Sequence, residues 1–116
     1  MCGFIGIFGE TKSNYIDKIN IEKCLSKSRY RGPDSSSIIS TNLLTLGFNR
    51  LSINNLEFGK QPITFKQNDN DNDSFLCFNG EIFNYKELES KYLSPPYDRD
   101  EVNVLAGLFR VFSYDF

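Results

Sequence analysis

The residue best suited to chemistry is Cys2, which follows the initiating methionine. Removal of Met1, which a small second residue favours, would leave a thiol and a free α-amine on one residue. An α-amine titrates at about 7.7 to 8.0 and a thiol at about 8.5, so the amine can accept the thiol proton, directly or through a water molecule. Cys2 is therefore a candidate nucleophile that carries its own base. The alternative is a small buried apolar residue at the start of a strand.

Other catalytic and metal-binding classes are restricted by composition. The chain has no histidine, which excludes Ser-His-Asp and Cys-His catalysis and histidine-ligated zinc for these 116 residues. Its three cysteines, at positions 2, 24 and 77, form no CxxC pair, and an odd number fits no closed disulfide framework, so we expect a reducing compartment. No P-loop or GxGxxG motif occurs, and the Asn/Asp-rich stretch at 68–73 lacks the glycine and glutamate of a calcium loop. We predict no metal site.

Length and charge restrict the domain count and the partners. With 116 residues, 24% charged and 40% hydrophobic, the chain is one globular domain or part of one. A formal net charge of -2 gives no general attraction to nucleic acid or to anionic membranes, so we expect neither as a partner. The opening residues lack a basic leader and a long apolar run, so we expect no signal peptide and no membrane span, and a cytoplasmic protein.

The elements that would position Cys2 begin directly after it. The stretch 4–9 is short, apolar and interrupted by glycine, which is typical of a buried strand. A helix is predicted between 16 and 25, with Ser13 or Asn14 as its N-cap and Ile21 off the apolar stripe, which consists of Ile16, Ile19, Cys24 and Leu25.

Two pairs of strands are predicted next. The β-capable runs 36–40 and 43–48 flank Thr41-Asn42, a tight hairpin turn at which the asparagine would take a positive φ. A second pair, 63–66 and 75–78, is joined by a polar Asn/Asp-rich linker. Because this linker cannot bury apolar surface, we expect a solvated loop.

Two helices are predicted in the last third of the chain. The first covers 85–92, with an apolar stripe of Tyr85, Leu88 and Tyr92. The second begins near Arg99, where Asp98 and Glu101 have the spacing of a capping box, and its stripe consists of Val102, Leu105, Ala106 and Phe109. A strand over 108–115 is the alternative, because its aromatic and β-branched residues also suit a sheet.

Five short motifs occur in a fixed order along the chain. They are Met1-Cys2-Gly3-Phe4-Ile5-Gly6, Tyr30-Arg31-Gly32-Pro33-Asp34-Ser35, Arg50-Leu51-Ser52-Ile53, Gln61-Pro62 and Phe78-Asn79-Gly80-Glu81-Ile82-Phe83-Asn84-Tyr85. In this order they resemble the class II glutamine amidotransferases. The residues within the motifs are most similar to those of the N-terminal glutaminase domain in the asparagine synthetase branch. The resemblance runs from the N-terminus to about Ala106. The last ten residues fit either a continuing helix or, across a deletion, a later strand of the family.

The resemblance implies a fold and a reaction. The fold is α+β, a four-layer αββα sandwich of N-terminal nucleophile hydrolases, of which residues 1–116 would form the N-terminal, incomplete part of a type 2 glutamine amidotransferase domain. Mature Cys2 would attack the side-chain amide carbon of L-glutamine, form a thioester and release ammonia, after which water releases glutamate. Asn79 and Gly80 match the motif that stabilises the oxyanion. By itself, an Asn-Gly pair is more simply a turn.

The resemblance also implies a substrate-binding set. Glutamine presents an α-carboxylate, which suits a fork-shaped cation, and an α-ammonium, which suits carboxylates. Arg50 would bind the carboxylate, and Glu81 and Asp100 the ammonium. Asp98 is an alternative to Asp100, because the family places one residue between its Asp and its Glu. The complete set is Arg50, Leu51, Ser52, Ile53, Asn54, Glu81 and Asp100.

Neighbouring positions follow or depart from the family. Arg31 and Asp34 belong to a block that would shape the pocket wall, although Gly32-Pro33 between them also fits a simple turn. Phe48 stands where the family commonly has a histidine two positions before Arg50, so an aromatic replaces one polar support of the pocket. Without the resemblance, the arginine fits a strand-end charge.

The expected partners are L-glutamine and an ammonia-accepting synthetase domain or subunit that forms asparagine. The glutaminase step needs no cofactor, and ATP and magnesium are expected only for a synthetase domain, which these 116 residues do not include. The sequence is compatible with a monomer and with a homodimer. The alternatives to an active glutaminase are a non-catalytic glutaminase-like domain for assembly or regulation, and a fragment that forms no stable protein alone.

Overall fold

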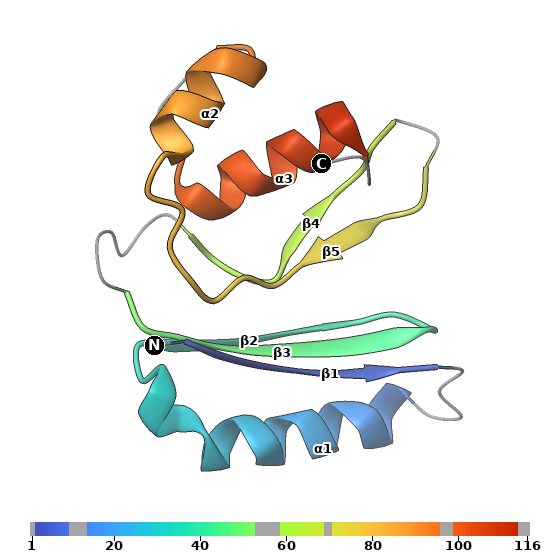
Figure 1. The fold of residues 1–116 in the computed structure, drawn as a ribbon. Helices are drawn as coiled ribbons and strands as arrows, with labels where there is room; N and C mark the ends of the chain where they lie inside the picture. The colour runs from blue at the N-terminus through green and yellow to red at the C-terminus, as the bar shows by residue number, and fades with distance from the viewer. Residues whose placement is uncertain (1, 10–13, 53–58, 69–70, 96–98, 114–116) are drawn as a thin grey trace. The chain divides into compact units, whose positions relative to one another are not determined.

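The chain folds into an α+β protein (Figure 1). The computed structural model describes residues 2–9, 14–52, 59–68, 71–95 and 99–113. These residues form three α-helices and two antiparallel sheets, so the predicted α+β class is confirmed, whereas the stacking into four layers stays a prediction. The chain divides into two compact units, residues 1–55 and 56–116. No helix in the described ranges has the length and apolar character needed to cross a membrane.

The first unit is built on a three-stranded antiparallel sheet. Its strands β1 (Gly3–Phe8), β2 (Ser35–Ser40) and β3 (Leu44–Arg50) lie in the order β1-β3-β2. The predicted opening strand and hairpin are therefore confirmed. The predicted burial of the opening strand is wrong, because the residues of β1 alternate between half-buried and exposed. In the β1–β3 register Phe4 is opposite Phe48, and their rings stack with centroids 6.5 Å apart. Phe48 thus packs on its strand partner.

The helix α1 (Asn14–Lys27) covers one face of this sheet (Figure 1). Ile21 and Leu25 are buried on β3, where a Cβ on Gly47 would overlap Ile21 Cγ2 and lie 2.9 Å from Leu25 Cδ1. The predicted helix is confirmed. Its predicted stripe is right at Leu25, which is buried, but wrong at Cys24, which is exposed, and it omits Ile21, which is 0% exposed. Because Gly47 has no side chain, Ile21 fits against β3 at this position. The buried face of α1 is therefore rotated from the face predicted from the helix's own sequence.

A buried asparagine ties the end of α1 to the sheet. Asn49 Nδ2 donates to the carbonyl of Leu25 (2.8 Å) and to Ser28 Oγ (3.0 Å), and its Oδ1 accepts from Ser36 Oγ (2.6 Å). The side chain is fully buried, so these bonds replace those it would make with water. They hold the strand immediately before Arg50 in place.

The hairpin between β2 and β3 closes through a threonine. Thr41 Oγ1 accepts the N–H groups of Leu43 (3.2 Å) and Leu44 (3.1 Å), and the Thr41 N–H donates to the Leu44 carbonyl (2.7 Å). Among the described residues, Ser113 is the only non-glycine with a positive φ, so the positive φ predicted at Asn42 is wrong. The hydroxyl satisfies the turn N–H groups, and a left-handed residue is not needed.

The second unit contains a two-stranded sheet. Strands β4 (Ile63–Phe65) and β5 (Ser74–Leu76) pair antiparallel, with Ile63 opposite Leu76. The predicted strand pair is confirmed, although both strands are shorter than predicted. In the described part of the linker, the exposed residues are Asn68, Asn72 and Asp73, as expected for a solvated loop.

Two helices complete the second unit. α3 (Glu101–Phe112) packs on β4, and α2 (Tyr85–Tyr92) packs on α3 (Figure 1). Both predicted helices are confirmed, and the strand alternative is wrong for 108–112, which are helical. The buried face of α3 includes two residues outside the predicted stripe, since it consists of Val102, Val104, Ala106 and Leu108.

The buried residue of α2 is a carboxylate. Glu89 is 2% exposed, and its Oε1 accepts from the backbone N–H (3.0 Å) and the Nη1 (3.1 Å) of Arg99. Arg99 Nη2 also donates to the carbonyl of Ser94 (3.1 Å). The ion pair between Glu89 and Arg99 links α2 to the chain just before α3. The predicted apolar stripe of α2 is wrong at Tyr92, which is exposed.

Candidate active site

Cys2 lies immediately before β1, and its half-buried thiol contacts the backbone that follows β3. The N–H of Leu51 donates to Sγ (3.3 Å), and the thiol donates to the Leu51 carbonyl (3.6 Å). Arg31 Nε donates to the carbonyl of Cys2 (3.4 Å). Because β1 pairs with β3, with Gly3 opposite Asn49, the candidate nucleophile meets the predicted substrate-binding stretch.

The Arg-Gly-Pro-Asp motif supports the backbone around Arg50. The Asp34 N–H donates to the carbonyl of Arg50 (3.0 Å), and Asp34 Oδ2 accepts the N–H of Ser52 (2.6 Å). Gly32 is buried against β3, where a Cβ would lie 2.6 Å from Arg50 N and would also overlap the Asn49 carbonyl. Glycine is therefore required there for packing. The motif holds the backbone after β3 through the bonds of Asp34 to Arg50 and to Ser52.

The stretch after β3 contains one buried polar atom without a hydrogen-bond partner among the described residues. This atom is the hydroxyl oxygen of Ser52. Such a group costs about 1 to 3 kcal/mol, which a ligand oxygen or amine would relieve. Arg50, which ends β3, is half-buried. Ile53 and Asn54 lie outside the described residues, so their role stays a prediction.

The predicted oxyanion and ammonium-binding residues at 79–81 lie in the second unit, after β5, and all three are exposed. The backbone on both sides of these residues bonds to side chains from elsewhere in the unit. The Phe78 N–H donates to Gln61 Oε1 (2.6 Å), and the Ile82 N–H donates to Glu101 Oε2 (3.2 Å). Neither acceptor is predicted as a site residue, although Gln61 belongs to one of the five motifs. The segment held in this way consists of Asn79, Gly80 and Glu81.

Asp100 is the N-cap of α3. Its Oδ1 accepts the backbone N–H of Asn103 (2.9 Å), and its Oδ2 accepts from Asn103 Nδ2 (2.9 Å). Asp98 lies outside the described residues. The predicted capping box that begins at Asp98 is wrong, because the N-cap of α3 is Asp100. The Glu101 carboxylate accepts the N–H of Ile82. A carboxylate has about four acceptor positions, so Asp100 keeps capacity for an ammonium ligand.

The remaining cysteines are poor nucleophiles or lie elsewhere. Burial raises the pKa of the Cys77 thiol to about 11, so it stays protonated at neutral pH. Cys24 is exposed on α1 and belongs to none of the five motifs. Within the described ranges, no three His, Cys, Asp or Glu side chains cluster in a way that would hold a metal ion. Cys2 is therefore the thiol that the site can use.

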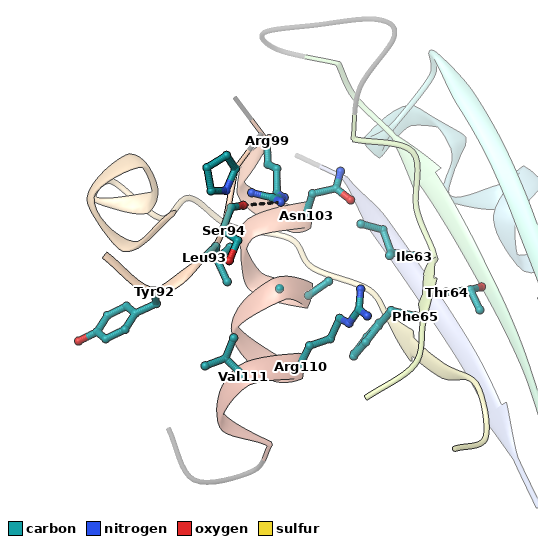
Figure 2. Close-up of a pocket in the computed structure, with 13 residues that line it drawn as sticks. Ile63, Thr64, Phe65, Tyr92, Leu93, Ser94, Arg99, Asn103, Arg110 and Val111 are labelled. Carbon is teal, nitrogen blue, oxygen red and sulfur yellow. Dashed lines mark hydrogen bonds between the residues drawn. The ribbon is translucent and has the colours of Figure 1, made fainter. Parts of the chain in front are cut away.

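A groove of about 600 Å³ lies elsewhere in the second unit, between β4, the residues after α2, and α3 (Figure 2). Figure 2 shows Arg110 extending from α3 toward Phe65 of β4, with Arg99 at the start of the helix. None of the predicted site residues lines this groove. It is therefore a feature separate from the motif residues.

The chain matches known proteins over most of its length. A family model for a glutamine amidotransferase domain matches residues 1–101. Glutamine-hydrolysing asparagine synthetase 1 of Bacillus subtilis (strain 168) is 35% identical over 112 residues, which is 91% of this chain and 17% of that protein. A probable glutamine-hydrolysing asparagine synthetase of Acanthamoeba polyphaga mimivirus is 37% identical over 120 residues, covering 99% of this chain and 21% of that protein.

The same pattern extends to vertebrates. The glutamine-hydrolysing asparagine synthetase of Gallus gallus is 35% identical over 97 residues, which is 79% of this chain and 16% of that protein. The chain thus spans between 16% and 21% of the length of these curated relatives. The match over residues 1–101 shows that the chain belongs to the glutamine amidotransferase family and resembles the N-terminal domain of the glutamine-hydrolysing asparagine synthetases.

Proposed function

We propose that the chain, once Met1 is removed, is the glutaminase part of an amidotransferase and hydrolyses L-glutamine to glutamate and ammonia through a thioester on Cys2. The family supports glutamine as the amide donor. The observation that carries the proposal is the contact of the Cys2 thiol with Leu51, whose N–H lies 3.3 Å from Sγ, directly after Arg50. The candidate nucleophile thereby contacts the backbone of the residue that follows Arg50, and a guanidinium has the shape that suits an α-carboxylate.

The proposed reaction begins with transfer of the thiol proton to the free α-amine of Cys2. The sulfur then attacks the amide carbon, and the carbonyl electron pair moves to oxygen, which gives a tetrahedral oxyanion. Collapse of this intermediate breaks the C–N bond, and the nitrogen takes the proton from the amine and leaves as ammonia. Water attacks the resulting thioester, which releases glutamate and returns the thiol.

The second unit would supply the groups that stabilise charge. In the proposal, the Asn79 side-chain amide and the Gly80 N–H donate to the oxyanion, and losing one such donor costs ~10² to 10³ in rate. Glu81 and Asp100 accept from the α-ammonium, which is consistent with the open acceptor positions on Asp100. The proposal thus takes its nucleophile from the first unit and its charge-stabilising groups from the second.

The first unit would bind the α-carboxylate. Arg50 donates to it, together with the Ser52 hydroxyl and the backbone of Leu51, Ile53 and Asn54. The unpartnered, buried Ser52 hydroxyl supports this assignment, because a carboxylate oxygen would supply the hydrogen bond that the described residues do not. Asp34 would act indirectly, since its carboxylate holds the Ser52 backbone and does not reach the ligand in this proposal.

The ammonia would serve asparagine formation in a synthetase domain or subunit, where ATP and magnesium would be needed. The names of the relatives support this use, since each is a glutamine-hydrolysing asparagine synthetase. The free cysteines are consistent with the reducing cytoplasm.

The test combines intact mass with turnover. We expect the chain without Met1 to release glutamate from glutamine, and the glutamine mimic diazo-oxo-norleucine to label Cys2. Cys2→Ala should lower turnover by ~10³ or more and abolish labelling, whereas Cys24→Ala, on the exposed face of α1, should change neither. A folded, trimmed chain that binds glutamine without turnover or labelling would contradict hydrolysis and favour the non-catalytic domain.

A further inference from the structure

We propose that Gln61 and Glu101 are positioning residues that hold the oxyanion segment, residues 79–81, in its working geometry. The inference rests on the proposed function for the role of that segment. Its structural basis is independent of that function, because both contacts are made by side chains of the second unit to the backbone that brackets the segment.

The first contact extends the β4–β5 pairing where the strands themselves cannot. Ile63 is opposite Leu76, so Gln61 and Phe78 lie two residues further along the same antiparallel register. Pro62, which lies between Gln61 and Ile63, has no N–H and cannot donate to the ladder of strand hydrogen bonds. Gln61 Oε1 instead accepts the N–H of Phe78 (2.6 Å), and the side chain is only 8% exposed. A buried amide thus replaces a backbone partner directly before Asn79.

The second contact is made by Glu101, the first residue of α3. Glu101 is half-buried in the first turn of α3 and accepts the Ile82 N–H on Oε2 (3.2 Å). The turn is fixed by the Asp100 cap and by Val102 and Val104, which are buried. A carboxylate near a helix N-terminus is favoured by the helix dipole, and carboxylate oxygens are strong hydrogen-bond acceptors.

Together the two bonds fix the segment at both ends. Oxyanion donors are effective only when they are preorganised, because their alignment must not be established during the reaction. The segment itself is exposed and makes no strand pairing. In this arrangement Gln61 and Glu101 touch backbone amides and not substrate, so their loss should lower kcat by misaligning Asn79 and Gly80 and leave KM for glutamine nearly unchanged.

The experiment compares matched variants of the full chain without Met1. Glu101→Ala and Gln61→Met remove an acceptor, and each should lower kcat about tenfold to a hundredfold, less than the loss of a donor itself, with KM within about twofold. Glu101→Gln keeps an acceptor oxygen and should recover most of the rate. Glu87→Ala and Gln67→Met alter the same residue types elsewhere in the unit, and their kcat should match the wild type.

Amide hydrogen exchange gives a second readout that does not depend on turnover. The amides of Phe78 and Ile82 should exchange at least tenfold faster in Gln61→Met and Glu101→Ala respectively, while the amides of α3 keep their protection. Unchanged exchange, or unchanged kcat in an active protein, would overturn the inference. If the wild type is inactive, the proposed function fails, and the exchange rates still decide whether the two side chains hold the segment.

Discussion

The two units place their predicted site residues by different means. In the first unit, Cys2 meets Leu51 because a six-residue strand ladder runs beside it, and many backbone bonds share that task. In the second unit, the 79–81 segment lies beyond a three-residue strand and is bracketed by two side-chain acceptors. A ladder tolerates single substitutions, whereas a single side-chain bond does not. We therefore expect the position of Cys2 to be robust to substitutions around it, and the position of the 79–81 segment to be sensitive to them.

The largest expected effect tests whether the first unit also depends on a single side chain, which would be Asn49. Asn49→Leu would leave the Leu25 carbonyl and the hydroxyls of Ser28 and Ser36 without their partner. We expect a loss of about 2 to 4 kcal/mol in the free energy of unfolding, measured by urea denaturation. Asn20→Leu, on the exposed side of α1, should cost less than about 0.5 kcal/mol. Equal losses would show that the buried network contributes nothing particular.

The next prediction contrasts thiols of the two units. Because burial raises the pKa of Cys77 to about 11, its reactive thiolate is roughly a hundredfold scarcer than that of an unperturbed thiol at the same pH below 9. Alkylation followed by mass spectrometry should modify the exposed Cys24 at pH 8 and spare Cys77. The rate at Cys77 should rise about tenfold per pH unit until the pH approaches its pKa. Comparable rates at pH 8 in the folded chain would refute the burial.

The smallest expected effect concerns the ion pair before α3. Arg99→Met leaves the buried Glu89 carboxylate without its guanidinium partner, although the backbone N–H of residue 99 remains. Since Arg99 is partly exposed, we expect a loss of about 1 to 2 kcal/mol in unfolding free energy. Arg110→Met, on the exposed side of α3, serves as the control and should cost less than about 0.5 kcal/mol. If both cost the same, the pair does not fasten the segment.

Element positions were largely predictable from local pattern. The apolar opening run, the hairpin runs and the helices around 85–92 and after Arg99 all formed as predicted, because strand and helix periodicity record which face is buried. The phase of α1 was not predictable, because Ile21 owes its burial to a glycine on a distant strand. Nor was the turn at Thr41, where a hydroxyl replaced the expected left-handed asparagine.

The candidate site divides in the same way. Motif order alone predicted site roles for Cys2, Arg50 and the 79–81 segment, and these roles stay predictions. It left open whether Asp98 or Asp100 faces the ligand, and the structure shows what Asp100 does locally, which is to cap α3. Glu101 has no signal in its own sequence neighbourhood, because its partner, Ile82, is 19 residues away and is bound through the backbone.

The sequence alone determined the family and the order of the elements and predicted Cys2 as the nucleophile, because residue type and spacing are local properties of a chain. Only the tertiary structure decided which side chains contact the predicted site residues and the backbone beside them. The contacts of Gln61 with Phe78, Glu101 with Ile82 and Cys2 with Leu51 join residues 17, 19 and 49 positions apart. Such pairs form because packing and buried hydrogen bonding are satisfied in three dimensions, and neither leaves a periodic trace in the sequence.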